Sequence, residues 1–211
     1  MSDTTKGDVS PHVVAVGEVL WDLLPGGAQI GGTSANFVCH ARELSARVAL
    51  ASAVGDDDLG REIVRRMQAR GVDTAAVAVV PDKQTGIVEV SVDASGMPTY
   101  RIVEDVAWDH IPWSASVARL ASTADVVCWG TLAQRSPGSR ATVADFLNQV
   151  GPETLKVFDI NLRVPDPDRA MVEASLQRAD VVKLNDEELP RVAELCGIAE
   201  RAVLGQLAEL S

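Results

Sequence analysis

Aromatic residues, cysteines and long apolar runs are scarce in this sequence. Only 4% of the 211 residues are aromatic while 46% are hydrophobic, so a buried core must be built mainly from Val, Ala, Leu and Ile. The three cysteines, Cys39, Cys128 and Cys196, are odd in number and far apart, which indicates reduced thiols and not a disulfide framework. No apolar run approaches the length needed to cross a bilayer, so no membrane partner is expected.

Basic residues are also in deficit, with 19 Lys and Arg against 30 Asp and Glu and a net charge of -11. This balance argues against a nucleic acid or an anionic membrane surface as partner. A phosphate ligand is not excluded, because it needs only local amides and a cation. The first residues, Met1 to Lys6, are polar and lack the apolar region of a signal peptide. We therefore expect a cytoplasmic protein with a disordered tail over residues 1–11.

Several common catalytic and nucleotide-binding motifs are missing. Gly26 and Gly31 have the spacing of a Walker loop, but a glycine stands where that loop needs its lysine. No Gly-x-Gly-x-x-Gly follows the first apolar run, which disfavours a dinucleotide enzyme, and no Gly-x-Ser-x-Gly elbow supports a hydrolase. The three histidines, His12, His40 and His110, lack ligand spacing, so a structural metal is not expected.

What the sequence does contain is a regular alternation of short apolar runs and amphipathic segments. The runs predict strands and the amphipathic segments predict helices. The expected strands are 12–17, 19–24, 48–54, 77–80, 126–129, 155–160 and 181–184, and the expected helices are 35–47, 59–69, 139–150, 169–178 and 186–195. Repeated strand-helix units predict a doubly wound, mainly parallel sheet with helices on both faces.

The segment 85–103 has a different pattern, in which two extended stretches flank Asp93-Ala94-Ser95-Gly96. Such a pattern is typical of a β-hairpin and not of a strand-helix unit. We expect this hairpin to form a small separate sheet together with the extended piece at 19–24.

The stretch from Gly31 to Asn36 contains two adjacent glycines before a predicted helix. Glycines let a backbone pass close to a small ligand, because no Cβ stands in the way. Thr33 or Ser34 is predicted to cap the helix that begins at Ala35, and Asn36 then presents a donor and an acceptor toward the ligand. The region is therefore a candidate binding site.

An acidic turn, Asp56-Asp57-Asp58, precedes the next predicted helix. Three carboxylates in a row invite a metal interpretation. At a helix start, however, they more often serve as a cap and as partners of the helix dipole, and we favour that interpretation. Asp56 or Asp57 is the expected cap.

Polar side chains follow three of the predicted strands. Asp22 follows Gly17 in an extended stretch, where its carboxylate could accept two hydroxyl hydrogens of a sugar diol or could simply be a solvated turn residue. Two further groups end neighbouring strands: Asp159, Asn161 and Arg163, and then Lys183, Asn185 and Glu188. Because alternate residues of a strand share a face, Asp159, Asn161 and Arg163 are all expected to face a crevice at the carboxyl edge of the sheet.

Taken in order, these motifs resemble those of the ribokinase-like (PfkB) carbohydrate kinases, and fructokinase-like members in particular. The glycine pair, an asparagine and spaced small residues form the family's N-terminal motif, matched here by Gly31, Gly32, Asn36, Ser45 and Gly55. Two positions depart from that motif: Ser34 stands where Gly, Ala or Pro is usual, and Val38 stands where a small residue is usual. The segments Asp159-x-Asn161-x-Arg163 and Asn185-x-x-Glu188 match two more family motifs.

This resemblance implies ATP-dependent phosphorylation of a sugar hydroxyl, with ATP and Mg²⁺ as cofactors. The implied sugar is fructose or another ketose, with ketohexonates and nucleosides as alternatives. The implied substrate contacts are Asp22, Gly32, Asn36, Thr85, Arg101, Asp159 and Arg163. The implied nucleotide and phosphate contacts are Lys183, Asn185 and Glu188, with Glu188 also holding Mg²⁺ through water. Arg101 could instead pair with Glu89 across the hairpin.

The fold that the resemblance implies is a ribokinase-like domain over residues 12–211 with a small β-lid. The lid segments are about 18–30 and 85–104, and a homodimer formed through the lid is implied as well. The C-terminal part of this fold is expected to be missing.

Kinases of this family carry a C-terminal Gly-Ala-Gly-Asp segment that supplies an anion hole and the catalytic base. The only Gly-Asp pairs here are Gly7-Asp8 and Gly55-Asp56, so we expect the base to lie beyond Ser211. The expectation is a truncated kinase that is inactive or severely impaired, because transfer depends on those groups. The alternative is a non-catalytic sugar-binding or interaction protein derived from a sugar kinase.

Overall fold

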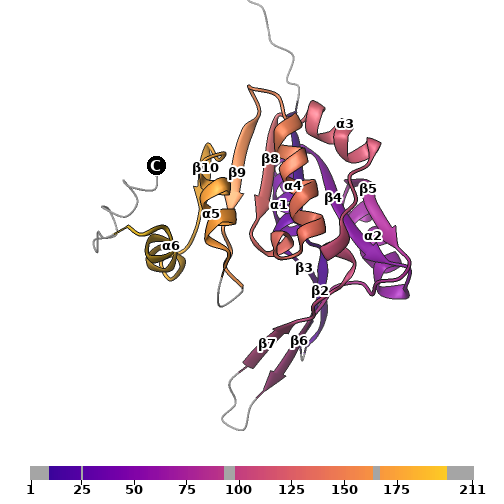
Figure 1. The fold of residues 1–211 in the computed structure, drawn as a ribbon. Coiled ribbons are helices and arrows are strands. Elements are labelled where there is room, and N and C mark those ends of the chain that lie inside the picture. Colours follow the sequence, from indigo (N-terminus) through magenta and orange to yellow (C-terminus); the bar gives the residue numbers. More distant parts are fainter. Residues whose placement is uncertain (1–9, 25, 93–97, 164–166, 199–211) are drawn as a thin grey trace, which may run out of the picture.

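The computed structural model describes residues 10–24, 26–92, 98–163 and 167–198 (Figure 1). Most of the expected tail over residues 1–11 lies outside this part, as do residue Ser211 and the expected hairpin turn at 93–96. The described residues form two sheets, one of six strands and one of four. The strands of the larger sheet are β1 (His12–Val16), β4 (Arg47–Gly55), β5 (Val72–Val80), β8 (Val126–Gly130), β9 (Leu155–Asp159) and β10 (Val181–Lys183).

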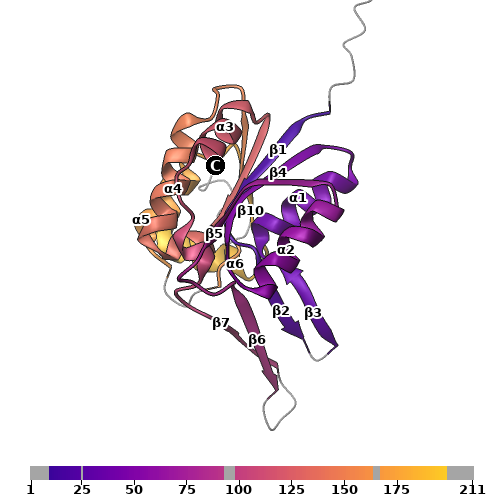
Figure 2. The ribbon, with the colours of Figure 1, turned by 90° about the vertical axis from the view of Figure 1, so that its right-hand side faces the viewer.

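Helices cover both faces of the six-stranded sheet (Figure 2). The helices are α1 (Thr33–Glu43), α2 (Asp58–Ala69), α3 (Ala115–Thr123), α4 (Pro137–Gln149), α5 (Arg169–Leu176) and α6 (Glu188–Cys196), with short 3-10 helices η1 (Ala107–His110) and η2 (Leu132–Arg135). One hydrophobic core lies between the sheet and α1 with α2, a second lies beneath α3, α4 and α5, and a smaller third one lies around η1 and η2. The doubly wound arrangement predicted from the sequence is confirmed.

The core is built mainly from small aliphatic side chains, with a few large aromatic ones. All five residues of β1 are buried, which explains its continuous apolar sequence, since a parallel strand inside such a sheet has no exposed face. Trp129 on β8 stacks on Phe158 of β9 with ring centroids 5.5 Å apart. These aromatics lie in the core beneath α4 and α5, where they fill the space between the strands and both helices.

The order of the parallel strands is β10-β9-β8-β1-β4-β5. The chain therefore builds outward from β1 to β5 on one side and then returns to place β8 on the other side of β1. The carboxyl ends of β1 and β8 thus lie at the point where the winding reverses. In open α/β sheets this switch point leaves a crevice that ligands occupy.

The smaller sheet lies beyond these carboxyl ends, as Figure 1 shows, and has the order β3-β2-β6-β7. Its strands are β2 (Leu20–Leu24), β3 (Gly27–Gly31), β6 (Ile87–Val92) and β7 (Pro98–Ile102). Antiparallel pairing joins β2 to β3 and β6 to β7, and parallel pairing joins β2 to β6. The predicted hairpin and its pairing with the extended piece at 19–24 are confirmed. We call this smaller sheet the lid.

The sequence did not predict β3, because its glycines resemble a turn. Three of its five residues are exposed, so the strand has little apolar pattern and forms through main-chain pairing with β2. Helix α3 was also missed, although Ser114 caps it by accepting a hydrogen bond from the Val117 N–H at 3.3 Å. The strand expected at 77–80 begins earlier, at Val72.

The predicted cap of α1 is wrong. The helix begins at Thr33 and its cap position is Gly32, which offers no side chain for the purpose. Ser34 is fully buried, and the hydroxyl of Thr33 is engaged by Asn161. The first turn of α1 instead gains a partner from outside the helix, because the Glu18 carboxylate accepts a hydrogen bond from the Thr33 N–H.

The acidic turn before α2 serves as a helix cap, as predicted. Asp57 caps α2 by accepting a hydrogen bond from the Gly60 N–H at 2.7 Å. The flanking carboxylates of Asp56 and Asp58 pair with Arg61 at the surface. Asp57 also accepts hydrogen bonds from the Thr85 N–H and hydroxyl, so the cap ties α2 to the segment that leads into the lid.

Replacing Asp57 with alanine is expected to lower the free energy of unfolding by about 1–2 kcal/mol, the usual cost of a lost helix cap. Burial acts to raise the pKa of Asp57, but the hydrogen bonds from Thr85 and Gly60 outweigh it and hold the pKa below its ordinary value. Because the folded pKa is lowered, this stabilisation should be present near neutral pH and be lost as the pH falls. Urea denaturation at several pH values measures it. Asp58→Ala, at a fully exposed carboxylate, is the control and should change stability little.

A buried ion pair joins the returning lid hairpin to the loop after β8. The Arg135 guanidinium donates to both carboxylate oxygens of Asp109, at 2.8 and 2.7 Å, and to the main-chain oxygen of Val103 at 2.7 Å. The guanidinium also lies over the ring of Trp108, 4.0 Å from its centroid. Asp109 and Arg135 are only 5% and 16% exposed, so both charges depend on each other for solvation.

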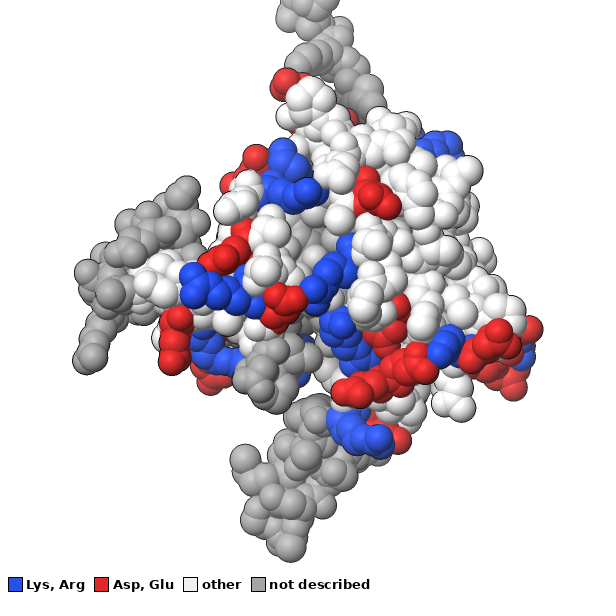
Figure 3. Space-filling model, viewed as in Figure 1, with Lys and Arg blue, Asp and Glu red and all other residues white. Residues whose placement is uncertain are grey.

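No helix in the described ranges is both long and apolar enough to cross a membrane. The three cysteines are free, as expected. On the face shown in Figure 3, acidic and basic side chains are interspersed and form no extended patch of one sign.

Candidate functional site

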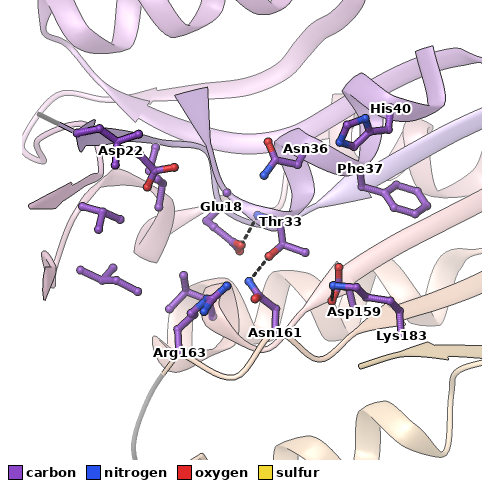
Figure 4. Close-up of a pocket in the computed structure, with 16 residues that line it drawn as sticks. Glu18, Asp22, Thr33, Asn36, Phe37, His40, Asp159, Asn161, Arg163 and Lys183 are labelled. Carbon is purple, nitrogen blue, oxygen red and sulfur yellow. Dashed lines mark hydrogen bonds and ion pairs between the residues drawn. The ribbon is translucent and has the colours of Figure 1, made fainter. Parts of the chain in front are cut away.

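A cavity of about 820 Å³ lies between the lid and the carboxyl ends of β1, β8, β9 and β10 (Figure 4). This is the position of the switch point, where the strand order leaves a crevice open. Its three main walls are the lid, one face of α1, and the ends of β9 and β10 with the loop after β9, and Glu18 after β1 and Leu132 of η2 also line it. The site is therefore assembled from segments that are far apart in the sequence.

The lid wall is formed by alternate residues of β2. Leu20, Asp22 and Leu24 face the cavity, joined by Val88 of β6 and Ile102 of β7. Asp22 supplies the charge on this wall. Burial raises the pKa of Asp22, while the nearby charge of Arg163 acts in the opposite direction. The wall thus offers one hydrogen-bonding carboxylate within an apolar surface.

The glycine pair allows this wall and α1 to meet. A Cβ on Gly31 would overlap the Asp22 carboxylate. Gly32 has φ +101°, and a Cβ there would lie only 2.6 Å from the main-chain oxygen of Glu18. Both glycines therefore make room for protein groups, and Gly32 also lines the cavity.

The second wall is one face of α1. Thr33, Asn36, Phe37 and His40 follow at helical spacing and all line the cavity. The Asn36 side chain is directed toward the space between the lid and the loop after β9, as Figure 4 shows. This confirms the predicted orientation of Asn36, whose amide can both donate and accept hydrogen bonds.

The third wall follows β9 and β10. Asp159, Asn161 and Arg163 all face the cavity, as predicted, while Ile160 and Leu162 between them are buried. Lys183, at the end of β10, places its Nζ 3.1 Å from Asp159 Oδ1. Burial raises the pKa of Asp159, and the hydrogen bond and charge of Lys183 oppose that shift. The two cations of this wall stand across the cavity from Asp22 and Asn36.

Asn185 and Glu188 do not line the cavity. Asn185 Oδ1 accepts hydrogen bonds from the N–H groups of Glu187 and Glu188, at 3.0 and 2.8 Å. Glu188 is 5% exposed, and its carboxylate accepts from the N–H groups of Leu162 and Asn185, at 3.0 and 2.9 Å. Glu188 therefore joins the loop after β9 to the loop after β10, and its contact with Mg²⁺ stays a prediction.

Thr85 and Arg101 also lie away from the cavity wall. Thr85 is 2% exposed and its hydroxyl donates to Asp57 and accepts from the Gly55 N–H. Arg101 pairs with Glu89 at 2.9 Å across β6 and β7, so the cross-strand alternative is the one the structure has. Their roles as sugar contacts stay predictions.

Sequence reasoning missed Glu18 as part of the site. It is fully buried, lines the cavity and accepts a hydrogen bond from the Thr33 N–H at 2.8 Å. Burial is the main cause that raises the pKa of its carboxyl group. The available signal was a single acidic residue inside the apolar run from Val13 to Leu20. Among the described residues, no group of three or more His, Cys, Asp or Glu could hold a metal ion.

The arrangement is suited to a small polar ligand. Carboxylates and amides accept and donate hydrogen bonds to hydroxyl groups, and the lid supplies apolar surface to cover them. Arg163 and Lys183 on the third wall could compensate negative charge on the same ligand or on a second one.

Comparisons with known proteins agree with this geometry. Residues 26–210 match the model of the pfkB family of carbohydrate kinases. The chain is 28% identical over 165 residues to a putative sugar kinase of Pyrococcus horikoshii, covering 75% of this chain and 53% of that protein. It is 29% identical over 194 residues to a fructokinase of Salmonella typhimurium, covering 86% of this chain and 62% of that one.

Among solved structures, an uncharacterised sugar kinase from Pyrococcus horikoshii in complex with ATP is similar in fold, with a TM-score of 0.73 and 25% identity. The match covers 86% of this chain and 66% of that one. The chain thus spans between about half and two thirds of the length of these relatives.

Proposed function

The chain belongs to the pfkB family of carbohydrate kinases, and on that basis we propose that the cavity beneath the lid binds a sugar for ATP-dependent phosphorylation. The observation that carries the proposal is the position of Asp22, Asn36 and Arg163 on three facing walls of one cavity at the switch point. The sugar is fructose or another ketose, by likeness to the Salmonella fructokinase.

In this proposal Asp22 accepts hydrogen bonds from two neighbouring hydroxyls, because one carboxylate offers two oxygens. Gly32 and Asn36 contact the same sugar from α1, and Asp159 and Arg163 contact it from the loop after β9. Thr85 and Arg101, which lie off the cavity wall, would require a movement of the lid to reach it. A closing lid excludes water, as phosphoryl transfer requires.

The phosphoryl donor is proposed to be ATP, the nucleotide bound by the similar kinase from Pyrococcus horikoshii. Lys183 would contact its phosphates from the end of β10. Mg²⁺ would neutralise phosphate charge when bound. Both oxygens of Glu188 already accept main-chain hydrogen bonds, so its carboxylate fits a metal-bound water and not a direct metal bond. Asn185, which accepts hydrogen bonds from the N–H groups of Glu187 and Glu188, would orient the loop after β10 near the phosphates.

The 211 residues contain no Gly-Ala-Gly-Asp segment, so we propose that they bind the sugar but transfer phosphoryl groups very slowly. The anion hole and the general base each contribute about 10²–10⁴ in rate in typical enzymes. Fructose phosphorylation by residues 1–211 is therefore expected to be at least about 10⁴-fold slower than an ordinary turnover of about 10 s⁻¹. ADP release with ATP, Mg²⁺ and fructose, measured by a coupled assay, gives the rate.

Two outcomes separate this proposal from its alternatives. Turnover at an ordinary enzymatic rate would contradict the impaired activity and leave the sugar kinase assignment intact. Saturable sugar binding with no ADP release above the enzyme-free control would favour the second candidate, a non-catalytic sugar-binding protein. That candidate is favoured because residues of this chain supply all three facing walls of the cavity.

A further inference from the structure

Glu18 has a feature that the sugar contacts do not explain. It follows β1, has no exposed surface, and uses only one of its carboxylate oxygens. Oε1 accepts the hydrogen bond from the Thr33 N–H, whereas Oε2 is buried and has no hydrogen-bond partner among the described residues. A buried carboxyl oxygen without a partner is costly, so such a group is retained only where it has a role.

The hydrogen bond of Glu18 continues into a second contact. The hydroxyl of Thr33 accepts a hydrogen bond from the side-chain amide of Asn161 (Figure 4). Asn161 has φ +40°, a conformation that asparagine adopts more readily than most residues. A series of hydrogen bonds therefore joins the ends of β1 and β9 to the start of α1, through Glu18, Thr33 and Asn161. We call this series the Glu18 relay.

The Glu18 relay lies between the proposed sugar contacts. Asn36 belongs to the same first turn as Thr33, since its N–H donates to the Gly32 oxygen at 2.9 Å. Asp159 and Arg163 flank Asn161 by two residues on either side. The distance across the cavity between the α1 wall and the wall after β9 therefore depends on the two hydrogen bonds of Thr33.

We infer that Glu18 is a positioning residue of the sugar site, which sets the spacing between Asn36 and the Asp159–Arg163 segment through Thr33 and Asn161. This inference rests on the proposed function, because it concerns the affinity for the sugar. Glu18 acts through its neighbours and need not touch the sugar itself.

The protonation of Glu18 offers a way to observe this role. Burial raises the pKa of Glu18, hydrogen bonds from Thr33 oppose that shift, and the charge of Asp159 adds to it. The other charged or titratable groups on the surrounding walls are Asp22, His40, Arg163 and Lys183. Because the pKa of Glu18 is raised in the folded protein, the folded site favours its neutral form. Rising pH ionises the Glu18 carboxyl and places a negative charge in the Glu18 relay, which burial disfavours. The substitution Glu18→Gln would keep the acceptor and leave the side chain neutral at every pH.

The experiment is calorimetric titration with fructose of the wild type and four variants, across the range of pH in which all of them stay folded. Glu18→Ala removes the relay, Glu18→Gln keeps its neutral form, and Thr33→Val keeps the N–H but removes the link to Asn161. Thr154→Val is the matched control for Thr33→Val, since Thr154 is a buried threonine whose hydroxyl donates to the Ala124 oxygen and which does not line the cavity. The melting temperature of every variant is measured alongside.

We expect Glu18→Ala and Thr33→Val to weaken fructose binding by about 10-fold or more, the scale of one lost hydrogen bond in a buried site. Glu18→Gln should bind like the wild type at the acidic end of this range and better than the wild type as the pH rises, because burial disfavours the ionised form of Glu18. Thr154→Val should lower the melting temperature without changing the affinity, because its hydrogen bond lies away from the cavity. The inference is overturned if Glu18→Ala binds fructose like the wild type, or if Glu18→Gln and the wild type share one pH profile. A failure of the proposed function gives a different result, because the wild type itself would then bind no sugar. The inference about Glu18 would be overturned in that case as well.

Discussion

Replacing Arg135 with alanine should lower the free energy of unfolding by about 3–5 kcal/mol, the cost of leaving one partner of a buried ion pair alone. The Asp109 side chain is only 5% exposed in the wild type, and the variant removes its guanidinium partner. It also removes the donor to the Val103 oxygen and the cation over Trp108. Because these contacts join the lid hairpin to the loop after β8, we expect the lid to loosen before the sheet unfolds.

Urea denaturation followed by tryptophan fluorescence measures this effect. Arg101→Ala is the matched control, since it removes an arginine from an ion pair in which Arg101 and Glu89 are 74% and 47% exposed. Exposed pairs contribute little to stability, so the control should be close to the wild type. If Arg135→Ala lowers the free energy of unfolding no more than Arg101→Ala does, the structural role of the buried ion pair is contradicted.

Replacing Gly32 with alanine should both destabilise the protein and strongly weaken sugar binding. The strained backbone of a non-glycine residue held at φ +101° costs about 1–3 kcal/mol of stability. The Cβ of an alanine here would also lie only 2.6 Å from the main-chain oxygen of Glu18. Relief of that overlap requires α1 to move away from Glu18, which breaks the hydrogen bond to Thr33 and displaces Asn36. We expect affinity for the sugar to fall by about 100-fold or more, equivalent to two lost hydrogen bonds.

The control for this variant is Gly138→Ala. Gly138 lies in α4, has no positive φ, and a Cβ there would meet its nearest atom at an ordinary 3.5 Å. Alanine in a helix is favoured over glycine by about 0.5–1 kcal/mol, so the control should be neutral or slightly stabilised. Calorimetry and thermal unfolding of both variants check the pair. Unchanged sugar affinity in Gly32→Ala would show that the glycine pair does not shape the site.

The parallel sheet and the helices around it could be predicted because buried strands have continuous apolar sequences, as β1 and β4 do. The cavity wall after β9 could also be predicted, since Asp159, Asn161 and Arg163 alternate with apolar residues. In both cases a local pattern determines which side chains are buried. Strand β3 has no such pattern, because its exposed residues Gly27, Ala28 and Gln29 form a strand only through pairing with β2.

The parts of the site that escaped prediction depend on contacts between distant segments. The cap of α1 was assigned to Thr33 or Ser34 from local preference, but Glu18 reaches the Thr33 N–H from the end of β1. The main-chain hydrogen bonds through which Glu188 joins the loops after β9 and β10 were not predicted either, and its expected phosphate contact stays a prediction. Residue type and spacing can indicate that a polar side chain has a structural or binding role. They do not show which main-chain group from a distant segment it contacts.

The most direct test of the account is calorimetric titration of fructose and other ketoses into the wild type, Asp22→Asn and Asp145→Asn. Asp145 is an exposed aspartate on α4 and serves as the control. We predict saturable binding of at least one ketose by the wild type and by Asp145→Asn, with a Kd in the range of about 1 μM–1 mM that is usual for such substrates. Asp22→Asn should bind about 10–100-fold more weakly, because a hydrogen bond to a charged group is lost. The account would be contradicted if no ketose bound saturably to the wild type, or if Asp22→Asn bound as tightly as the control.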